Sequence, residues 1–203
     1  MGCGGSKSTN ADADKVNVIF VIGGPGSGKG TQCAMIKDKY KYDHLSTGDI
    51  LRKIVSEEKI EGWQALKEKM DSGEFVDSAE LVGFVKAQFE KMRGKKVLLD
   101  GFPRNVSNIE EWDKQMDGLV DLKATLYFAC TEEEMKNRLL GRNEGRSDDK
   151  EEIMEKRIQT FVNETLPLVE RFRGSTLVEI DAMQEKDKVF EEVQKRFEQN
   201  KLD

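Results

Sequence analysis

Residues 18–31 read Val18-Ile19-Phe20-Val21-Ile22-Gly23-Gly24-Pro25-Gly26-Ser27-Gly28-Lys29-Gly30-Thr31. The apolar, β-branched run is typical of a buried strand. It leads into a glycine-rich turn, and a helix-like pattern follows at Gln32–Tyr40. Glycines let successive backbone N–H groups point inward without a side-chain clash, and the next helix adds unpaired N–H groups at the positive end of its dipole. Lys29 supplies a positive charge for the β- and γ-phosphates. Strand, loop and helix in this order predict a phosphate-binding loop rather than a glycine-rich turn without a ligand.

The composition is that of a globular protein. The chain has 203 residues, of which 37% are hydrophobic, so it is long enough for one compact α/β domain with a sizeable core. Its net charge of −6 argues against nucleic acid as the main partner. Its 33 basic residues still allow local clusters that hold phosphates.

The cysteines and the single histidine are widely spaced. Cys3, Cys33, Cys130 and His44 predict neither a zinc site nor a disulfide framework, which favours a reducing compartment such as the cytoplasm. We find no apolar run near the roughly 18 residues of a membrane span. The N-terminus also lacks the apolar segment of a secretory signal.

Residues 1–15 are polar and glycine-rich and predict a disordered tail. The start, Met-Gly-Cys-Gly-Gly-Ser, fits N-myristoylation of Gly2 with palmitoylation of Cys3 beside it. A single myristoyl chain binds membranes only marginally, so the second acyl chain would matter. The alternative is a plain flexible tail. We expect a cytoplasmic protein that sits partly at membranes.

Strand and helix patterns alternate along the rest of the chain. Five apolar segments are expected to be strands: 16–22, 44–46, 97–100, 123–130 and 176–180. Helices are expected after the first loop and at 60–71, 78–92, 131–140, 150–172 and 187–198, with Pro167 bending or breaking the fourth of these five. This pattern predicts an α/β three-layer fold with a central parallel five-stranded sheet and helices on both faces.

A second informative segment is Val97-Leu98-Leu99-Asp100-Gly101-Phe102-Pro103-Arg104. A buried strand ends in the Asp100 carboxylate, at the edge where ligands sit in open α/β sheets. Asp100 can hold Mg²⁺ or its bound waters, and Arg104 can grip a phosphate bidentately.

These motifs together resemble the nucleoside monophosphate kinases, the family of adenylate kinases and UMP-CMP kinases. The resemblance rests on residues 23–31, on Leu-Ser-Thr-Gly-Asp-Ile-Leu-Arg at 45–52 and on Asp-Gly-Phe-Pro-Arg at 100–104. It covers 16–202 and implies a P-loop core, a helical acceptor-binding insert near 45–77 and a short lid near 142–149 without zinc. It also implies reversible transfer of the γ-phosphoryl of Mg-ATP to a nucleoside monophosphate, by a monomer.

The resemblance implies a role for specific residues at each substrate. ATP is expected to bind Gly24, Pro25, Gly26, Ser27, Gly28, Lys29, Gly30, Thr31 and Arg138. The acceptor nucleotide is expected to bind Thr47, Arg52, Gly73, Val76, Gly101, Arg104, Asn108, Arg146 and Arg157. Asp77 stands where the family usually has proline, which bears on the expected contact of Val76 with the base.

The positively charged residues expected to act in catalysis are Lys29, Arg104, Arg142, Arg146 and Arg157. From composition alone, an arginine-rich run such as 138–157 reads as solvated surface, but the order of its spacings resembles the family's lid. Arginines that arrive on a closing lid would stabilise the transferring group and expel water. Asp148 and Asp149 either tie down the closed lid or form structural ion pairs.

The acceptor base is left open between two interpretations. Asn108, followed by Trp112, resembles UMP-CMP kinases, and a terminal amide can pair with cytosine or uracil. Thr47 and the Ser-Thr-Gly-Asp string resemble adenylate kinases, in which AMP is the acceptor. UMP or CMP is the preferred prediction. An alternative of another class is a membrane-tethered nucleotide-binding switch without turnover.

Overall fold

The structure is a computed structural model of the chain, and it describes residues 14–58, 60–141 and 151–203. Its centre is the predicted parallel five-stranded sheet, and the structure adds the strand order, which is β2-β3-β1-β4-β5. The strands are β1 (Val16–Ile22), β2 (Asp43–Ser46), β3 (Lys96–Asp100), β4 (Val120–Ala129) and β5 (Leu177–Asp181).

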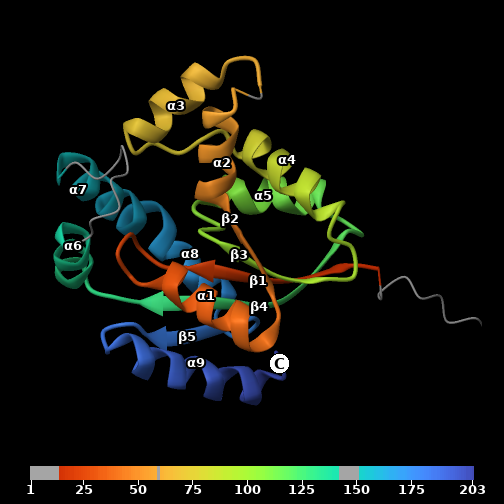
Figure 1. Cartoon of the computed structure of the whole chain (residues 1–203), viewed down its shortest axis with the longest axis vertical. Helices are drawn as coiled ribbons and strands as arrows, with labels where there is room; N and C mark the ends of the chain where they lie inside the picture. Colours follow the sequence, from red (N-terminus) through yellow and green to blue (C-terminus); the bar gives the residue numbers. More distant parts are fainter. Residues whose placement is uncertain (1–13, 59, 142–150) are drawn as a thin grey trace, which may run out of the picture.

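Helices connect the strands and cover both faces of the sheet (Figure 1). They are α1 (Lys29–Tyr40), α2 (Thr47–Ser56), α3 (Trp63–Asp71), α4 (Ser78–Phe89), α5 (Val106–Gln115), α6 (Glu132–Leu140), α7 (Glu151–Thr160), η1 (Phe161–Thr165), α8 (Leu166–Phe172) and α9 (Lys186–Asn200).

The core consists of two apolar layers, one on each side of the sheet. Phe20 and Leu99 face the layer that contains α4, α5 and α8. Ile19 and Leu98 face the other layer, which contains α1 and α9. Because both faces are covered, β1 and β3 read as continuous apolar runs instead of alternating ones.

The segment expected to bind the acceptor forms two helices, α2 and α3, at one end of the sheet (Figure 1). Ser46 caps α2 by accepting a hydrogen bond from the backbone N–H of Asp49. The loop after α3 reaches α7, where Lys156 Nζ lies 3.1 Å from Glu74 Oε1. Residues of the insert and of α7, Glu74 and Arg157 among them, line one cavity.

Two predicted helices differ from the observed ones. The helix expected at 60–71 begins only at Trp63, after Gly62 adopts a left-handed conformation. The helix expected over 150–172 is interrupted by the π-helical turn η1, and Pro167 then lies in the first turn of α8. A proline is tolerated at that position because the first N–H groups of a helix have no intrahelical partner.

No helix in the described part of the chain combines the length and apolar character needed to cross a membrane.

Candidate active site

The candidate site lies at the carboxyl edge of the sheet, where the loop after β1 faces the ends of β3 and β4. The connection from β1 to β2 passes over β3, and the connection from β3 to β4 passes over β1, so the chain changes direction across the sheet at β1. Ligands of open α/β sheets bind at such a switch point.

Gly24 and Gly26 of the glycine loop have no room for a side chain. A Cβ on Gly24 would lie 2.1 Å from Met135 Sδ, and one on Gly26 would lie 2.6 Å from the backbone oxygen of Met135. Gly26 and Gly28 also have φ values of 82° and 83°, which side chains rarely adopt. Helix α6, which carries Met135, therefore holds the loop from behind. No local sequence pattern indicates this contact.

Lys29 begins α1 and points into the loop. Its Nζ donates a hydrogen bond of 3.2 Å to the carbonyl oxygen of Gly24. Burial lowers the pKa of Lys29, and the neighbouring charge of Asp100 partly offsets this effect. A phosphate that entered the loop would bring the ammonium group a further anionic partner.

Asp100 ends β3 beneath the loop and is only 7% exposed. His44 Nε2 lies 3.2 Å from its Oδ2. Burial opposes ionisation of the carboxyl, but His44, Lys29 and Arg104 together hold the pKa of Asp100 below its ordinary value. Its other oxygen, Oδ1, is buried and has no hydrogen-bond partner among the residues that the structure describes. An ionised, partly unsatisfied carboxylate fits the hard Mg²⁺ ion or a water bound to it.

Hydrogen bonds of both its side chain and its backbone to other described residues hold Arg104 in place. Its Nε donates to Gly101 O at 2.8 Å, and its Nη2 donates to Thr47 Oγ1 at 3.1 Å. Its backbone N donates to Asn108 Oδ1 at 3.0 Å, and its backbone O accepts from Thr165 Oγ1 at 2.6 Å. Thr165 lies in η1, and sequence reasoning missed it.

Thr47 and Asn108 lie beneath the cavity and do not line it in this structure. Thr47 is fully buried, and its hydroxyl lies 3.2 Å from Asp100 O and 3.1 Å from Gly101 O. Asn108 is 2% exposed, and its Nδ2 donates to Ser78 Oγ at 2.7 Å. Both residues predicted to read the acceptor base are therefore engaged with protein atoms around Arg104.

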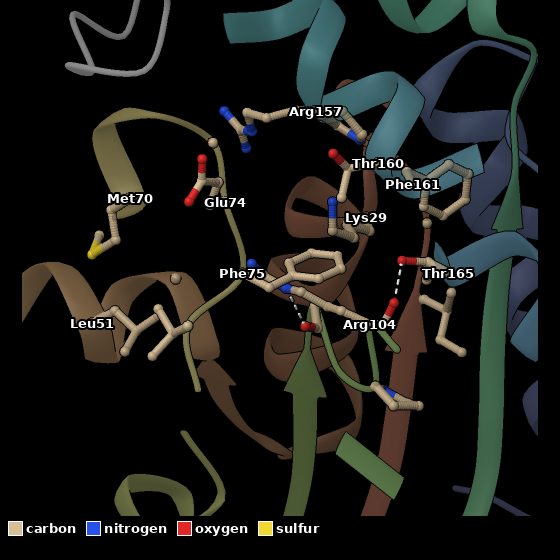
Figure 2. A pocket seen from close by; sticks show the side chains of 18 of the residues that line it. Lys29, Leu51, Met70, Glu74, Phe75, Arg104, Arg157, Thr160, Phe161 and Thr165 are labelled. Carbon is tan, nitrogen blue, oxygen red and sulfur yellow. Dashed lines mark hydrogen bonds between the residues drawn. The ribbon is translucent and has the colours of Figure 1, made fainter. Parts of the chain in front are cut away.

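Figure 2 shows Lys29, Arg104 and Arg157 around one cavity, with Phe75 of the insert beside them. Arg157 comes from α7, and a Cβ on Gly73 would lie 3.2 Å from its Cγ, so Gly73 allows the insert to approach that side chain. Eight of the predicted residues line this cavity: Pro25, Lys29, Arg52, Gly73, Val76, Gly101, Arg104 and Arg157.

Two predicted arginines are oriented by neighbouring carboxylates. Arg52 lies at the rim of the cavity and is paired with Asp49. Arg138 lies on the other side of the loop, where its Nη1 would be 3.9 Å from a Cβ on Gly28, and its Nε donates to Glu134 Oε1 at 2.6 Å. The predictions for Gly2, Cys3, Arg142, Arg146, Asp148 and Asp149 fall outside the described residues.

The fold also brings together three side chains that are distant in the sequence. Ligand atoms of Cys33, His44 and Asp100 all lie within 4.8 Å of one another. We predicted no zinc site because these residues are far apart in the sequence. In the folded chain they lie close together.

A glycine loop between strand and helix, a buried lysine within it, a carboxylate on the adjacent strand and converging arginines define a P-loop phosphotransferase. Comparison with known proteins narrows this class. Residues 21–177 match the adenylate kinase family, so the chain belongs to that family and is a nucleoside monophosphate kinase. Enzymes of this family use Mg²⁺ with ATP.

Individual relatives align over nearly their whole length. A protein of Danio rerio named UMP-CMP kinase is 40% identical over 194 residues, covering 92% of this chain and 99% of the relative. The UMP-CMP kinase of Homo sapiens is 39% identical over 189 residues, covering 89% and 96%. UMP-CMP kinase 3 of Arabidopsis thaliana is 39% identical over 195 residues, covering 96% and 95%.

Proposed function

We propose that this enzyme transfers the γ-phosphoryl of Mg-ATP reversibly to UMP or CMP, giving ADP and UDP or CDP. The main support for this proposal is the similarity, over nearly the full length, to proteins named UMP-CMP kinases. Asn108 with Trp112 four residues later supports the same acceptor, although Trp112 itself is buried in the core against Phe20 and Phe102.

The donor phosphates occupy the loop of residues 24–31. Its backbone N–H groups and the start of α1 attract the β- and γ-phosphates, and Lys29 exchanges its bond to Gly24 for a phosphate oxygen. Arg138, oriented by Glu134, stacks on the donor adenine. The nearness of Arg138 to Gly28 supports this placement.

The acceptor phosphate occupies the cavity above Asp100. Arg104 and Arg52 hold it, and Arg157 reaches the transferring group from α7. Gly73 and Val76 close the insert over the acceptor base. The cavity lined jointly by these side chains supports the arrangement.

Catalysis in this site is mainly positioning and electrostatic stabilisation. The attacking acceptor oxygen is already anionic, so no strong base is required. The transition state spreads negative charge over oxygens, which arginine forks bind well. We assign two roles to Arg142 and Arg146, on the lid of residues 142–149. They bind the same negative charge of the transition state, and they help to exclude water.

Mg²⁺ would be held through water by Asp100, whose Oδ1 has no hydrogen-bond partner in the described part of the chain. The ion would neutralise part of the phosphate charge. Within the protein, Asp100 keeps its charge through His44 and Lys29.

Base recognition requires Asn108 to present its amide to the cavity. Since Nδ2 is bound to Ser78 and Oδ1 to Arg104 in this structure, acceptor binding must replace at least the contact with Ser78. The edge of cytosine or uracil then replaces Ser78 as the hydrogen-bond partner of the Asn108 amide.

The test is kcat/KM for UMP, CMP and AMP with Mg-ATP on purified protein. We expect UMP and CMP to exceed AMP by at least tenfold, which corresponds to about 1.4 kcal/mol. A preference for AMP would show that Thr47 is the better guide to the base. Turnover of none of the three would favour the non-catalytic switch.

A second proposal concerns residues 1–15 as a membrane-attachment segment acylated on Gly2 and Cys3. The motif at residue 2 supports it, and two acyl chains would give stable anchoring. A mass spectrum of the native protein should show both additions, whereas an unmodified N-terminus would refute the proposal.

A further inference from the structure

Cys33, His44 and Asp100 meet beneath the glycine loop, each from a different element. Cys33 lies on α1, His44 on β2 and Asp100 at the end of β3, and their ligand atoms are within 4.8 Å of one another. Cys33 is fully buried and Asp100 is 7% exposed. A thiol, an imidazole and a carboxylate are the three ligand types that zinc-like cations take from proteins.

The separations suit one tetrahedral ion. Ligand atoms at zinc bond lengths of about 2.0–2.3 Å are about 3.4 Å apart around a tetrahedron. His44 Nε2 and Asp100 Oδ2 are already 3.2 Å apart. The remaining separations within the cluster are at most 4.8 Å, so a side-chain shift of about an ångström would bring all three ligand atoms to tetrahedral spacing.

An independent observation indicates that the cluster has unused binding capacity. Asp100 Oδ1 is buried, and none of the described residues gives it a hydrogen bond. Such a group costs about 1–3 kcal/mol if it stays unsatisfied, so a bound cation would satisfy the carboxylate and would take the place of the contact between His44 Nε2 and Asp100 Oδ2.

We propose that Cys33, His44 and Asp100 form an inhibitory site for a thiophilic divalent cation, with Zn²⁺ as the type case. The ion replaces the thiol proton of Cys33, which is released to solvent. It takes Nε2 of His44 while the ring proton resides on Nδ1. The fourth position is open to water.

Zn²⁺ bound at this site would inhibit phosphoryl transfer, because the same carboxylate, Asp100, serves the proposed Mg-ATP site. Mg²⁺ is a hard ion that prefers oxygen ligands and retains its waters, so it does not compete for the thiolate. A Zn²⁺ ion at Asp100 withdraws the carboxylate on which the proposed function relies for Mg-ATP. The inference rests on that function only for the effect on turnover, not for metal binding.

Neighbouring charges determine the strength of this site. Lys29 and Arg104 act electrostatically on Asp100, and they repel an added cation. The thiolate and carboxylate together neutralise the 2+ charge of the ion. We therefore expect reversible binding that a chelator removes, without the tight binding of a structural zinc site.

The binding test uses Co²⁺ as a spectroscopic substitute for Zn²⁺. In a Cys3→Ser/Cys130→Ser background, Cys33 is the only one of the 3 cysteines that remains. Co²⁺ should produce a near-ultraviolet thiolate-to-metal charge-transfer band that Zn²⁺ abolishes. Adding Cys33→Ala should remove the band. Absence of the band from the Cys33-containing protein would overturn the proposal.

The inhibition test compares the same two proteins at fixed Mg-ATP with increasing Zn²⁺. Because ATP sequesters zinc equally in both assays, a real site should make the half-inhibitory concentration at least tenfold higher in the Cys33→Ala protein. Equal inhibition would refute a regulatory role for the cluster. If Cys33→Ala fails to fold by circular dichroism, His44→Asn replaces it in both tests. An inactive protein that still shows the band would contradict the proposed function and leave this site standing.

Discussion

Gly26→Ala tests the inference that α6 supports the phosphate loop from behind. Gly26 has a φ of 82°, and an added Cβ would lie 2.6 Å from the backbone oxygen of Met135. The left-handed conformation costs a non-glycine residue about 1–2 kcal/mol. Contact with a backbone atom cannot be relieved by a rotamer change, and overpacking of this kind costs about 1–3 kcal/mol. The expected loss in unfolding free energy is therefore about 2–5 kcal/mol.

Gly118→Ala is the matched control, because Gly118 has a φ of 70° and a Cβ added there would have no atom of the described residues within 4 Å, apart from its own residue and its two chain neighbours. Gly118 lies in the turn before the amino end of β4, whereas the glycine loop follows the carboxyl end of the parallel strand β1. We expect this variant to lose only the conformational cost of about 1–2 kcal/mol. Urea unfolding at neutral pH measures both variants, and kcat/KM for ATP should fall in Gly26→Ala alone, because relief of the clash moves the loop N–H groups.

Equal destabilisation of the two variants would refute the contact between the loop and α6. Unchanged ATP kinetics in Gly26→Ala, with a large stability loss, would show that the loop relaxes without displacing the groups that bind phosphate. That second result would restrict the role of Met135 to folding.

Three further predictions concern single side chains. Lys29→Met should lower kcat by orders of magnitude while circular dichroism shows an intact fold, and near-normal activity would overturn the assignment of the loop. Thr165→Val should lose about 1–3 kcal/mol in urea unfolding and raise KM for the acceptor more than for ATP, because the hydroxyl supports the backbone of Arg104 at 2.6 Å; equal effects on both substrates would contradict this. Tyr42 donates to Leu202 O at 2.8 Å, and burial raises the pKa of Tyr42 to about 12. The unfolded phenol ionises near pH 10, so this stabilisation is complete below about pH 10 and is lost as the pH rises through the folded pKa, by about 2 kcal/mol at pH 12. Unfolding measured from pH 9 to about 12 should show that extra loss in the wild type relative to Tyr42→Phe, and parallel curves would contradict it.

Local patterns predicted the sheet well because they report directly on burial. The run Val16–Ile22 coincides with β1, since a strand covered on both faces is apolar at nearly every position, and Asn17 near its start is the one polar residue in it. Thr131 caps α6 by accepting a hydrogen bond from the N–H of Glu134, as its Thr-x-x-Glu spacing favours. The Glu134 side chain binds Arg138, so an ion pair takes the place of the reciprocal contact of a capping box.

Features that depend on distant contacts could not be inferred from the sequence. The π-helical turn at Phe161–Thr165 leaves no local pattern, and it places Thr165 against the Arg104 carbonyl, 61 residues away in the chain. Cys33 and His44 showed no metal-binding spacing because their proximity depends on how α1 packs against β2 and β3. The motifs located the phosphate-binding residues, whereas the residues that support them required the fold.

The positions of Thr47 and Asn108 change how acceptor specificity should be interpreted. Each was selected from the sequence as a reader of the base, but Thr47 contacts the Arg104 guanidinium and Asn108 contacts its backbone N–H. A substitution at either position therefore changes the support of the proposed phosphate ligand as well as the base pocket. A change in base preference will be accompanied by a change in kcat even for the favoured nucleotide. Selectivity must then be compared as ratios of kcat/KM within one variant, because the common effect on Arg104 cancels in that ratio.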